Sequence, residues 1–154
     1  SVMFFMEELI NLECIHLDEL FTDKDVFLEE LAKQAQKVSA GEDIDEILTE
    51  LWNRENMLPT CVGKQIAIPH CRSKIIKNSK IIFYRLKESI LWDENEKVNL
   101  VIAILTKEND NNEHLSLLSK LSRNLLREEF LKMLNITKDP NILLENIQRI
   151  LKGD

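Results

Sequence analysis

The sequence has little glycine and proline. With three Gly and three Pro among 154 residues, it contains no Ser/Gly-rich or Pro-rich segment that could link two domains. It also contains no internal repeat. We therefore expect residues 1–154 to form a single domain that is large enough to bury a substantial core, with disorder confined to its two ends.

Long apolar runs are also lacking. No run approaches the roughly 20 apolar residues that span a bilayer. The first residues, SVMFFMEEL, turn acidic at once and lack the basic region and the small-residue cleavage site of a signal peptide. The sequence therefore predicts a cytoplasmic protein with no direct membrane insertion.

Cysteine is scarce, and no CxxC motif occurs. Cys14, Cys61 and Cys71 leave one thiol unpaired in any disulfide scheme. A bond between Cys61 and Cys71 is geometrically possible but requires an oxidising compartment, which nothing else in the sequence indicates. We expect three reduced thiols.

An excess of basic residues is missing as well. The chain carries 20 basic and 27 acidic side chains, a net charge of −7. An extended nucleic-acid partner needs a basic face, so this balance argues against nucleic-acid binding while leaving room for a local basic patch.

Apolar residues at helical spacing predict two helices in the first third of the chain. The first begins at Thr22–Asp23, with Gly41 as its C-terminal cap. Its apolar stripe is Val26, Phe27, Leu31, Ala35 and Val38. The second runs from Asp43 to about Asn56 and is ended by Pro59.

Three strands are predicted in the middle of the chain, at residues 65–69, 80–87 and 98–105, and a weaker one at residues 14–17. Residues 98–105 are nearly all apolar, so both faces of that strand should be buried in the sheet centre. The polar segment 88–97 is expected to be anchored by Trp92.

The last third is predicted to be helical. Residues 109–112 offer side chains that can cap a helix starting at Glu113. Its expected stripe is Leu115, Leu118, Leu121 and Leu125. A short helix at 128–134 follows, and a final helix has Asp139 as N-cap and Pro140 at its first position. Helices, then strands, then helices indicate an α/β (α+β) sheet covered by helices on its faces.

Residues 54–73, RENMLPTCVGKQIAIPHCRS, hold many of the chain's special residues. The apolar triplet Ile66-Ala67-Ile68 is typical of a buried strand. Pro69 cannot donate a ladder hydrogen bond, so strand pairing should stop or reach an edge there. His70 would then lie at the mouth of a rigid sheet, either as a reactive imidazole or as a turn residue without chemistry.

Two further residues could join His70. His114 falls in the first turn of its helix, where the positive dipole end favours an anion and a neutral imidazole; it could equally be a surface histidine. Arg54 could bind phosphate oxygens in bidentate fashion if its helix ends beside the 66–69 strand. Otherwise it is a solvated arginine paired with a glutamate. His16, with no partner in its own segment, is interpreted as structural or exposed.

This constellation suits phosphoryl transfer through a phosphohistidine. A neutral imidazole is a good nucleophile toward phosphorus, and positive groups around it stabilise the charge that spreads over the transferring oxygens. No metal or other cofactor is needed. The alternatives are weaker, because His70, Cys71 and His114 match no common zinc spacing and nothing marks an oxyanion hole for a Cys71–His114 hydrolase.

Four segments resemble one known family. They are IAIPH, the upstream RE, RLKESILWD and EHLSLLSKLS, in matching order over roughly residues 6–151. Together they resemble the enzyme IIA domain of the fructose/mannitol class of the bacterial phosphoenolpyruvate-dependent sugar phosphotransferase system.

The resemblance implies a mixed sheet sandwiched between helices in three layers. It also implies that His70 is phosphorylated, flanked by Arg54 and His114. The implied donor is the histidine-containing phosphocarrier protein, and the implied acceptor is a cysteine of an enzyme IIB domain. Such domains carry phosphate for sugar uptake or act as regulatory modules, free or fused to transcription regulators.

The sequence departs from the family pattern directly after His70. Most members have glycine at the position of Cys71, and the preceding turn retains only Gly63. We expect the Cys71 side chain to line the approach to His70 and to bear on sugar specificity more than on phosphorylation.

Overall fold

The computed structural model describes residues 2–109 and 111–153. Ser1, Asp110 and Asp154 lie outside the described residues. The expected disorder at the two extreme ends and one residue of the predicted capping loop therefore lie outside them too. Within the described part, Val2–Leu9 is helical, which the sequence did not lead us to expect.

The chain alternates helical and extended regions in the predicted order. The helices are α1 (Val2–Leu9), the 3-10 turn η1 (Leu12–Cys14), α2 (Lys24–Lys37), α3 (Ile44–Met57), α4 (Asn111–Asn124), α5 (Glu128–Ile136) and α6 (Pro140–Leu151). The strands are β1 (Ile15–Glu19), β2 (Ile66–Ala67), β3 (His70–Ser73), β4 (Lys80–Asp93) and β5 (Glu96–Lys107).

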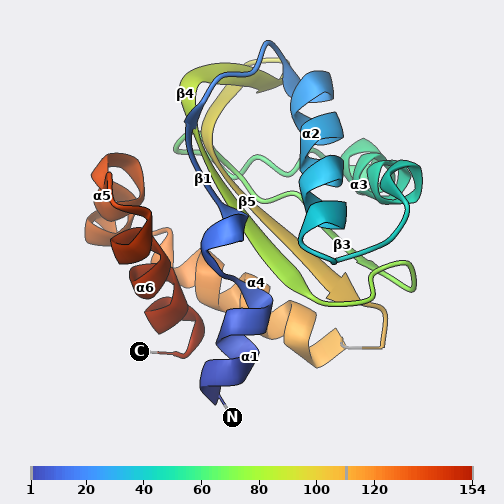
Figure 1. Cartoon of the computed structure of the whole chain (residues 1–154). Coiled ribbons are helices and arrows are strands. Elements are labelled where there is room, and N and C mark those ends of the chain that lie inside the picture. Colours follow the sequence, from blue (N-terminus) through green and yellow to red (C-terminus); the bar gives the residue numbers. More distant parts are fainter. Residues whose placement is uncertain (1, 110, 154) are drawn as a thin grey trace.

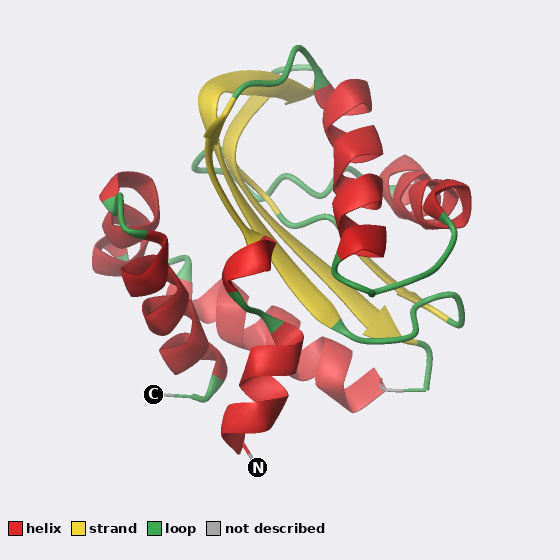
Figure 2. Cartoon of the chain, viewed as in Figure 1, coloured by secondary structure: helices red, strands yellow, loops and turns green. Residues whose placement is uncertain are grey.

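The strands form one mixed sheet in the order β1-β4-β5-β2, with β3 also paired to β5. β4 and β5 are antiparallel, whereas the other pairs are parallel. Helices α2 and α3 cover one face, and α4, α5 and α6 lie on the other (Figure 1). The same view coloured by secondary structure shows the sheet between two helical layers (Figure 2). The predicted mixed sheet sandwiched between helices is confirmed.

Three predicted helix starts are confirmed. The side chains of Asp23, Asp43 and Asp139 each accept a hydrogen bond from a backbone amide two or three residues on, at 2.8–2.9 Å. These bonds satisfy amides that have no partner within the helix, and the negative charge favours the positive end of the helix dipole. None of the helices in the described part of the chain is both long and apolar enough to cross a membrane.

The predicted cap of the first helix is wrong. α2 ends at Lys37, and the left-handed residue after it is Ser39, with φ of 66°. Gly41 serves packing instead, because a Cβ there would lie 3.0 Å from Ile47 Cδ1 and 3.1 Å from the carbonyl oxygen of Ile75. Glycine is needed at this position so that α3 and the segment after β3 can approach closely.

β4 and β5 form a longer hairpin than the sequence predicted. β5 is central and buried on both faces, as expected. However, β4 continues to Asp93, so most of the segment expected to be a polar connection is strand. Ile90 and Trp92 are buried while their neighbours are exposed, an alternation typical of a strand with one solvated face. Trp92 is the anchor that was expected.

The strand before His70 is interrupted at Pro69 and then resumes. β2 is only two residues long, and β3 begins at His70 and pairs in parallel with β5. Pro69 lacks a donor, but its carbonyl accepts from the amide of Ile104 at 2.9 Å. Among the named strands, β2 and β3 pair with β5 alone, so Pro69 lies at the edge of the sheet as predicted. Ala67 of β2 also forms an isolated antiparallel bridge with Cys61. His70 begins a strand rather than following one.

The buried face of α4 is rotated from the one predicted. Leu117, Leu121 and Leu125 are buried together with His114, whereas Leu115 is 55% exposed. The buried positions 114, 117, 121 and 125 follow helical spacing just as the predicted set does. The difference is that the first residue of the buried stripe is a histidine and not a leucine. Val26 of α2, also predicted to be buried, is 43% exposed.

Two leucines of α4 test this assignment. We expect Leu121→Ala to lower the free energy of unfolding by about 2–5 kcal/mol, because it removes a fully buried side chain and leaves a cavity. The matched Leu115→Ala should change it by no more than about 0.5 kcal/mol. Urea denaturation of both variants measures the difference, and equal losses would contradict the assigned face.

Candidate functional site

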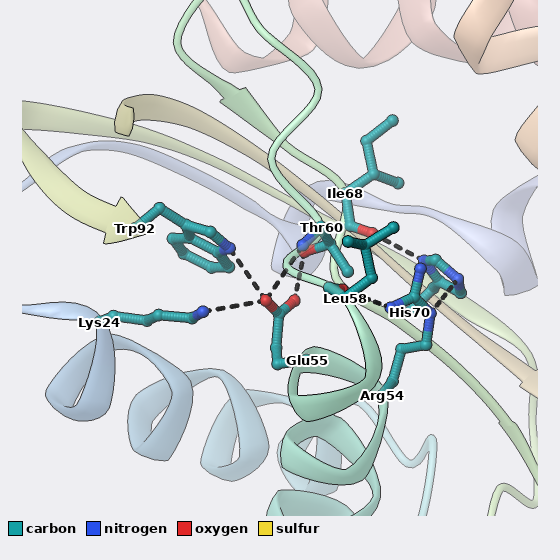
Figure 3. Close-up of polar contacts among 8 residues, drawn as sticks. All are labelled: Lys24, Arg54, Glu55, Leu58, Thr60, Ile68, His70 and Trp92. Atoms are coloured by element: carbon teal, nitrogen blue, oxygen red, sulfur yellow. Dashed lines mark hydrogen bonds and ion pairs between the residues drawn. The ribbon is translucent and has the colours of Figure 1, made fainter. Parts of the chain in front are cut away.

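The last turn of α3 brings Arg54 to the first residue of β3 (Figure 3). Arg54 Nε donates to Nε2 of His70 over 3.0 Å, and Arg54 Nη1 donates to the carbonyl oxygen of Leu58 over 2.6 Å. On the other side of the ring, His70 Nδ1 lies 2.8 Å from the carbonyl oxygen of Ile68. The condition under which Arg54 could join the site, a helix ending beside this strand, is therefore met.

These contacts determine the tautomer of His70. A carbonyl oxygen only accepts and a guanidinium only donates, so Nδ1 carries the proton and Nε2 carries the free lone pair. Burial is the largest cause that lowers the pKa of His70 below its usual value, and the Arg54 charge lowers it further, against the opposing effect of the bond to Ile68. The ring is therefore neutral and half-buried, and the lone pair of its Nε2 is available to act as a nucleophile.

His114 lies beside this ring. The two imidazole centroids are 5.4 Å apart with an interplanar angle of 53°. Thr106 Oγ1 is 2.8 Å from His114 Nδ1, and because a hydroxyl both donates and accepts, this contact suits either tautomer. The pKa of His114 is lowered, as the sequence led us to expect, but burial is the largest cause, followed by the neighbouring His70 and Arg72.

Arg72 was not singled out from the sequence. It follows His70 by two residues in β3, so both side chains lie on the same face of the strand. Its exposed guanidinium donates from Nη1 to the carbonyl oxygen of Glu108 over 2.9 Å. A second cation thus lies near His114, and the period of two along the strand was the signal that could have revealed it.

The expectation that Cys71 lines the approach to His70 is wrong. Alternation along β3 turns the Cys71 side chain into the core, where it is 5% exposed. Burial raises the pKa of its thiol to about 12, which disfavours the thiolate that a hydrolase dyad requires. All three cysteines are free, as predicted. Among residues 2–109 and 111–153, no group of three or more His, Cys, Asp or Glu side chains could hold a metal ion.

His16 lies in β1, at the sheet edge opposite β2. Its ring stacks on Tyr84, with centroids 4.3 Å apart, and its Nδ1 lies 2.9 Å from the carboxylate of Glu19. The structural interpretation fits this packing. The prediction that His16 has no partner in its own segment is wrong, because Glu19 belongs to the same strand.

A buried carboxylate next to Arg54 also escaped the sequence analysis. Glu55 is 3% exposed. It accepts hydrogen bonds from Thr60 and Trp92 and forms an ion pair with Lys24 (Figure 3). The signal was available in the sequence. Glu55 lies four residues after the buried Leu51, on the apolar face of α3, where a charged residue requires partners.

The arrangement provides one nucleophilic nitrogen and a cation in contact with it. Arg54 can turn its remaining N–H groups toward an anion at His70 Nε2, and His114 lies within reach of the same space. A half-buried site strengthens these interactions relative to water. Such a site can receive an electrophilic phosphoryl group without a bound cofactor.

Comparisons with known proteins agree with this chemistry. The family model described as "Phosphoenolpyruvate-dependent sugar phosphotransferase system, EIIA 2" matches residues 8–150. The chain is 31% identical over 137 residues to a multiphosphoryl transfer protein of Escherichia coli O157:H7, covering 88% of the chain and 16% of that protein. It is 30% identical over 144 residues to the fructose-specific EIIABC component of Bacillus subtilis, covering 92% of the chain and 23% of that protein. It thus spans less than a quarter of these relatives.

A regulator and two solved structures are also similar to the chain. The Bacillus subtilis transcriptional regulator ManR is 40% identical over 90 residues, covering 58% of the chain and 13% of the regulator. The nitrogen regulatory protein IIA-Ntr of Neisseria meningitidis has a TM-score of 0.82 and 27% identity, covering 96% of the chain and 99% of that chain.

The second structure, a complex of enzyme IIAMTL and phosphorylated enzyme IIBMTL from Escherichia coli, has a TM-score of 0.75 and 21% identity, covering 94% and 98%. This likeness concerns the fold, whereas the family model matches residues 8–150, nearly the whole sequence. The chain belongs to the EIIA 2 family of the phosphoenolpyruvate-dependent sugar phosphotransferase system.

Proposed function

We propose that this chain is a cytoplasmic phosphocarrier of a sugar phosphotransferase system. A single IIA-like domain, residues 1–154, accepts a phosphoryl group on His70 from the histidine-containing phosphocarrier protein and passes it to a cysteine of an enzyme IIB domain for sugar uptake. The observation that carries the proposal is the contact of Arg54 Nε with His70 Nε2, opposite an Nδ1 held by a backbone carbonyl.

In the first step, the Nε2 lone pair of His70 attacks phosphorus. The N–P bond of the donor phosphohistidine breaks, and its electron pair returns to the donor imidazole. The His70 ring becomes positively charged as its N–P bond forms, and the carbonyl oxygen of Ile68 stabilises the Nδ1–H of this imidazolium. Arg54 leaves the lone pair and donates to the phosphoryl oxygens, where negative charge is concentrated.

In the second step, the thiolate of an enzyme IIB cysteine attacks the same phosphorus. A P–S bond forms, the P–N bond breaks, and the electron pair returns to His70 Nε2. Because Nδ1 keeps its proton, the leaving group is a neutral imidazole rather than an imidazolate. The pKa of His70, lowered chiefly by burial, favours this neutral product.

The acceptor is supported by similar proteins. One structural neighbour is a complex of a IIA enzyme with phosphorylated IIB, and a relative combines the IIA, IIB and IIC parts in its name. A complex of a IIA enzyme with a phosphorylated IIB enzyme is the pairing proposed for this chain.

A second function, regulation of a partner by the phosphorylation state of the domain, is favoured by a different observation. The chain is 40% identical over 90 residues to the transcriptional regulator ManR. The chemistry at His70 is the same in both functions, and only the fate of the phosphoryl group differs. Rapid discharge to an enzyme IIB protein supports the carrier, whereas a long-lived phosphorylated form supports the regulator.

Phosphorylation in vitro tests the proposal. With labelled phosphoenolpyruvate, enzyme I and the histidine-containing phosphocarrier protein, we expect one phosphoryl group per chain, labile in acid and stable in base. Adding an enzyme IIB protein should then remove the label. Intact-mass spectrometry and label counting measure both steps, with enzyme I omitted as the control; no incorporation in the complete mixture would refute the function.

A further inference from the structure

The carboxylate of Glu55 lies at the centre of a buried polar cluster beside the site (Figure 3). Its Oε1 accepts from the Thr60 amide at 3.1 Å and from Trp92 Nε1 at 3.1 Å, while its Oε2 accepts from the Thr60 hydroxyl. The ammonium of Lys24 is 3.0 Å from Oε1. Four contacts thus converge on one side chain that is 3% exposed.

The cation of this cluster is itself fixed in position. Lys24 Nζ lies 4.9 Å from the ring centroid of Trp92 and 5.4 Å from that of Trp52. A buried charge is tolerated only with a partner and with its hydrogen-bonding capacity filled, and Glu55 has both. Removing one member leaves the others unsatisfied, so the cluster has one preferred arrangement.

A chain of hydrogen bonds leads from Glu55 to the nucleophile. Glu55 binds both the amide and the hydroxyl of Thr60. The carbonyl of Thr60 accepts from the amide of Ile68 at 2.9 Å. The carbonyl of Ile68 in turn accepts from Nδ1 of His70, so the group that holds the proton on His70 is fixed to the segment that Glu55 anchors.

A second connection leads from Glu55 to Arg54. The carbonyl of Leu58, which holds Arg54 Nη1, is two residues before Thr60 in the segment that leaves α3. Glu55 holds that segment at Thr60, and Arg54 is the residue directly before Glu55 in α3. The guanidinium and the imidazole are therefore oriented by the same turn of chain.

We propose that Glu55 is a positioning residue that acts through Thr60. It fixes the Ile68 carbonyl and the Leu58 carbonyl, and thereby sets both the tautomer of His70 and the direction of Arg54. Because Glu55 is 3% exposed, it acts through its neighbours rather than on the phosphoryl group itself. The inference rests on the proposed phosphocarrier function for its kinetic part, but not for its effect on the His70 tautomer.

A purely structural role predicts something different. If Glu55 only stabilised the fold, replacing it would lower the unfolding temperature and leave the folded fraction with a normal His70. If it positions the site, folded molecules should show an altered His70. The two roles are therefore separated by measurements on folded protein.

Two variants test the role of Glu55. Glu55→Gln keeps the shape but removes the charge and one acceptor oxygen, and Thr60→Val removes only the hydroxyl donor. The control is Glu29→Gln, an exposed glutamate of α2 with the same change of net charge. Folding is checked by circular dichroism, the His70 tautomer by two-bond proton–nitrogen NMR correlation, and transfer by initial rates against the concentration of the donor protein.

For the wild type and Glu29→Gln we expect a single Nδ1–H tautomer of His70. In both test variants we expect nitrogen shifts of a tautomer mixture and a fall in kcat of about 10-fold or more, as is typical when a group supporting a reactive residue is lost. KM for the donor protein should stay within about threefold of the wild-type value, because the substitutions remove no contact that binds the donor in the ground state.

An unchanged tautomer in the folded variants would overturn the positioning role, whatever happens to the rate. If Glu55→Gln does not fold, Thr60→Val decides alone. If the wild type accepts no phosphoryl group, the proposed function fails while the tautomer measurement still decides the role of Glu55.

Discussion

The variant His70→Ala is expected to take up no label from phosphoenolpyruvate under conditions that phosphorylate the wild type. His70 Nε2 is the nitrogen whose lone pair is free of a proton, while Nδ1 is held by the Ile68 carbonyl. Since the reaction needs a covalent N–P bond, the loss of this nitrogen removes the acceptor instead of weakening it. The fold should persist because the ring is only half-buried and begins an edge strand.

The two remaining histidines are the controls. His16→Ala should be labelled at the wild-type rate, because His16 stacks on Tyr84 at the far edge of the sheet. His114→Ala should be labelled more slowly, because it lies beside His70 without being the acceptor. Incorporation by His70→Ala at the rate of the wild type would show that another residue carries the phosphoryl group.

The elements of the fold that could be predicted are those with local signals. Asp23, Asp43 and Asp139 mark helix starts because a carboxylate that follows a loop binds the free amides of the first turn. The apolar run of β5 indicates a strand buried on both faces. These features depend on neighbours in sequence, so the sequence alone suffices for them.

Features that depend on distant neighbours were missed or misplaced. Gly41 was assigned to a helix end, but what requires glycine there is the approach of Ile47 and the Ile75 carbonyl. The second half of β4 was considered a polar connection because its exposed face is polar, although Ile90 and Trp92 alternate as a strand predicts. In both cases the decisive contact lies across the sheet or between layers.

The meeting of Arg54, His70 and His114 depended on both kinds of information. Apolar periodicity predicts the helices, and Pro69 after an apolar triplet predicts that His70 lies at the mouth of the sheet. That α3 ends beside β3 and that α4 turns His114 inward follow only from packing. The burial of Glu55 can be inferred from the sequence, because a charged residue on the apolar face of an amphipathic helix needs a partner elsewhere in the fold.

Removing the guanidinium should have the largest effect among substitutions that keep the nucleophile. For Arg54→Ala we expect the rate of phosphorylation to fall by about 100-fold or more, as with the loss of one preorganised donor to developing negative charge. Arg54→Lys should recover only part of the rate, because an ammonium is a point charge and cannot replace the guanidinium's contacts with His70 and Leu58 at once.

The pH dependence of the remaining activity identifies the cause. The pKa of His70 is lowered by burial and then by the Arg54 charge, and only the neutral ring is a nucleophile, so the wild-type rate falls as pH drops through that lowered pKa. Without the cation the pKa rises, and the acidic limb of the profile should move to higher pH in Arg54→Ala but little in Arg54→Lys. Single-turnover rates between pH 5 and 8 measure both profiles. A slower Arg54→Ala with an unmoved limb would mean that Arg54 stabilises the phosphoryl oxygens without lowering the pKa of His70, and rates within threefold of the wild type would remove it from the site.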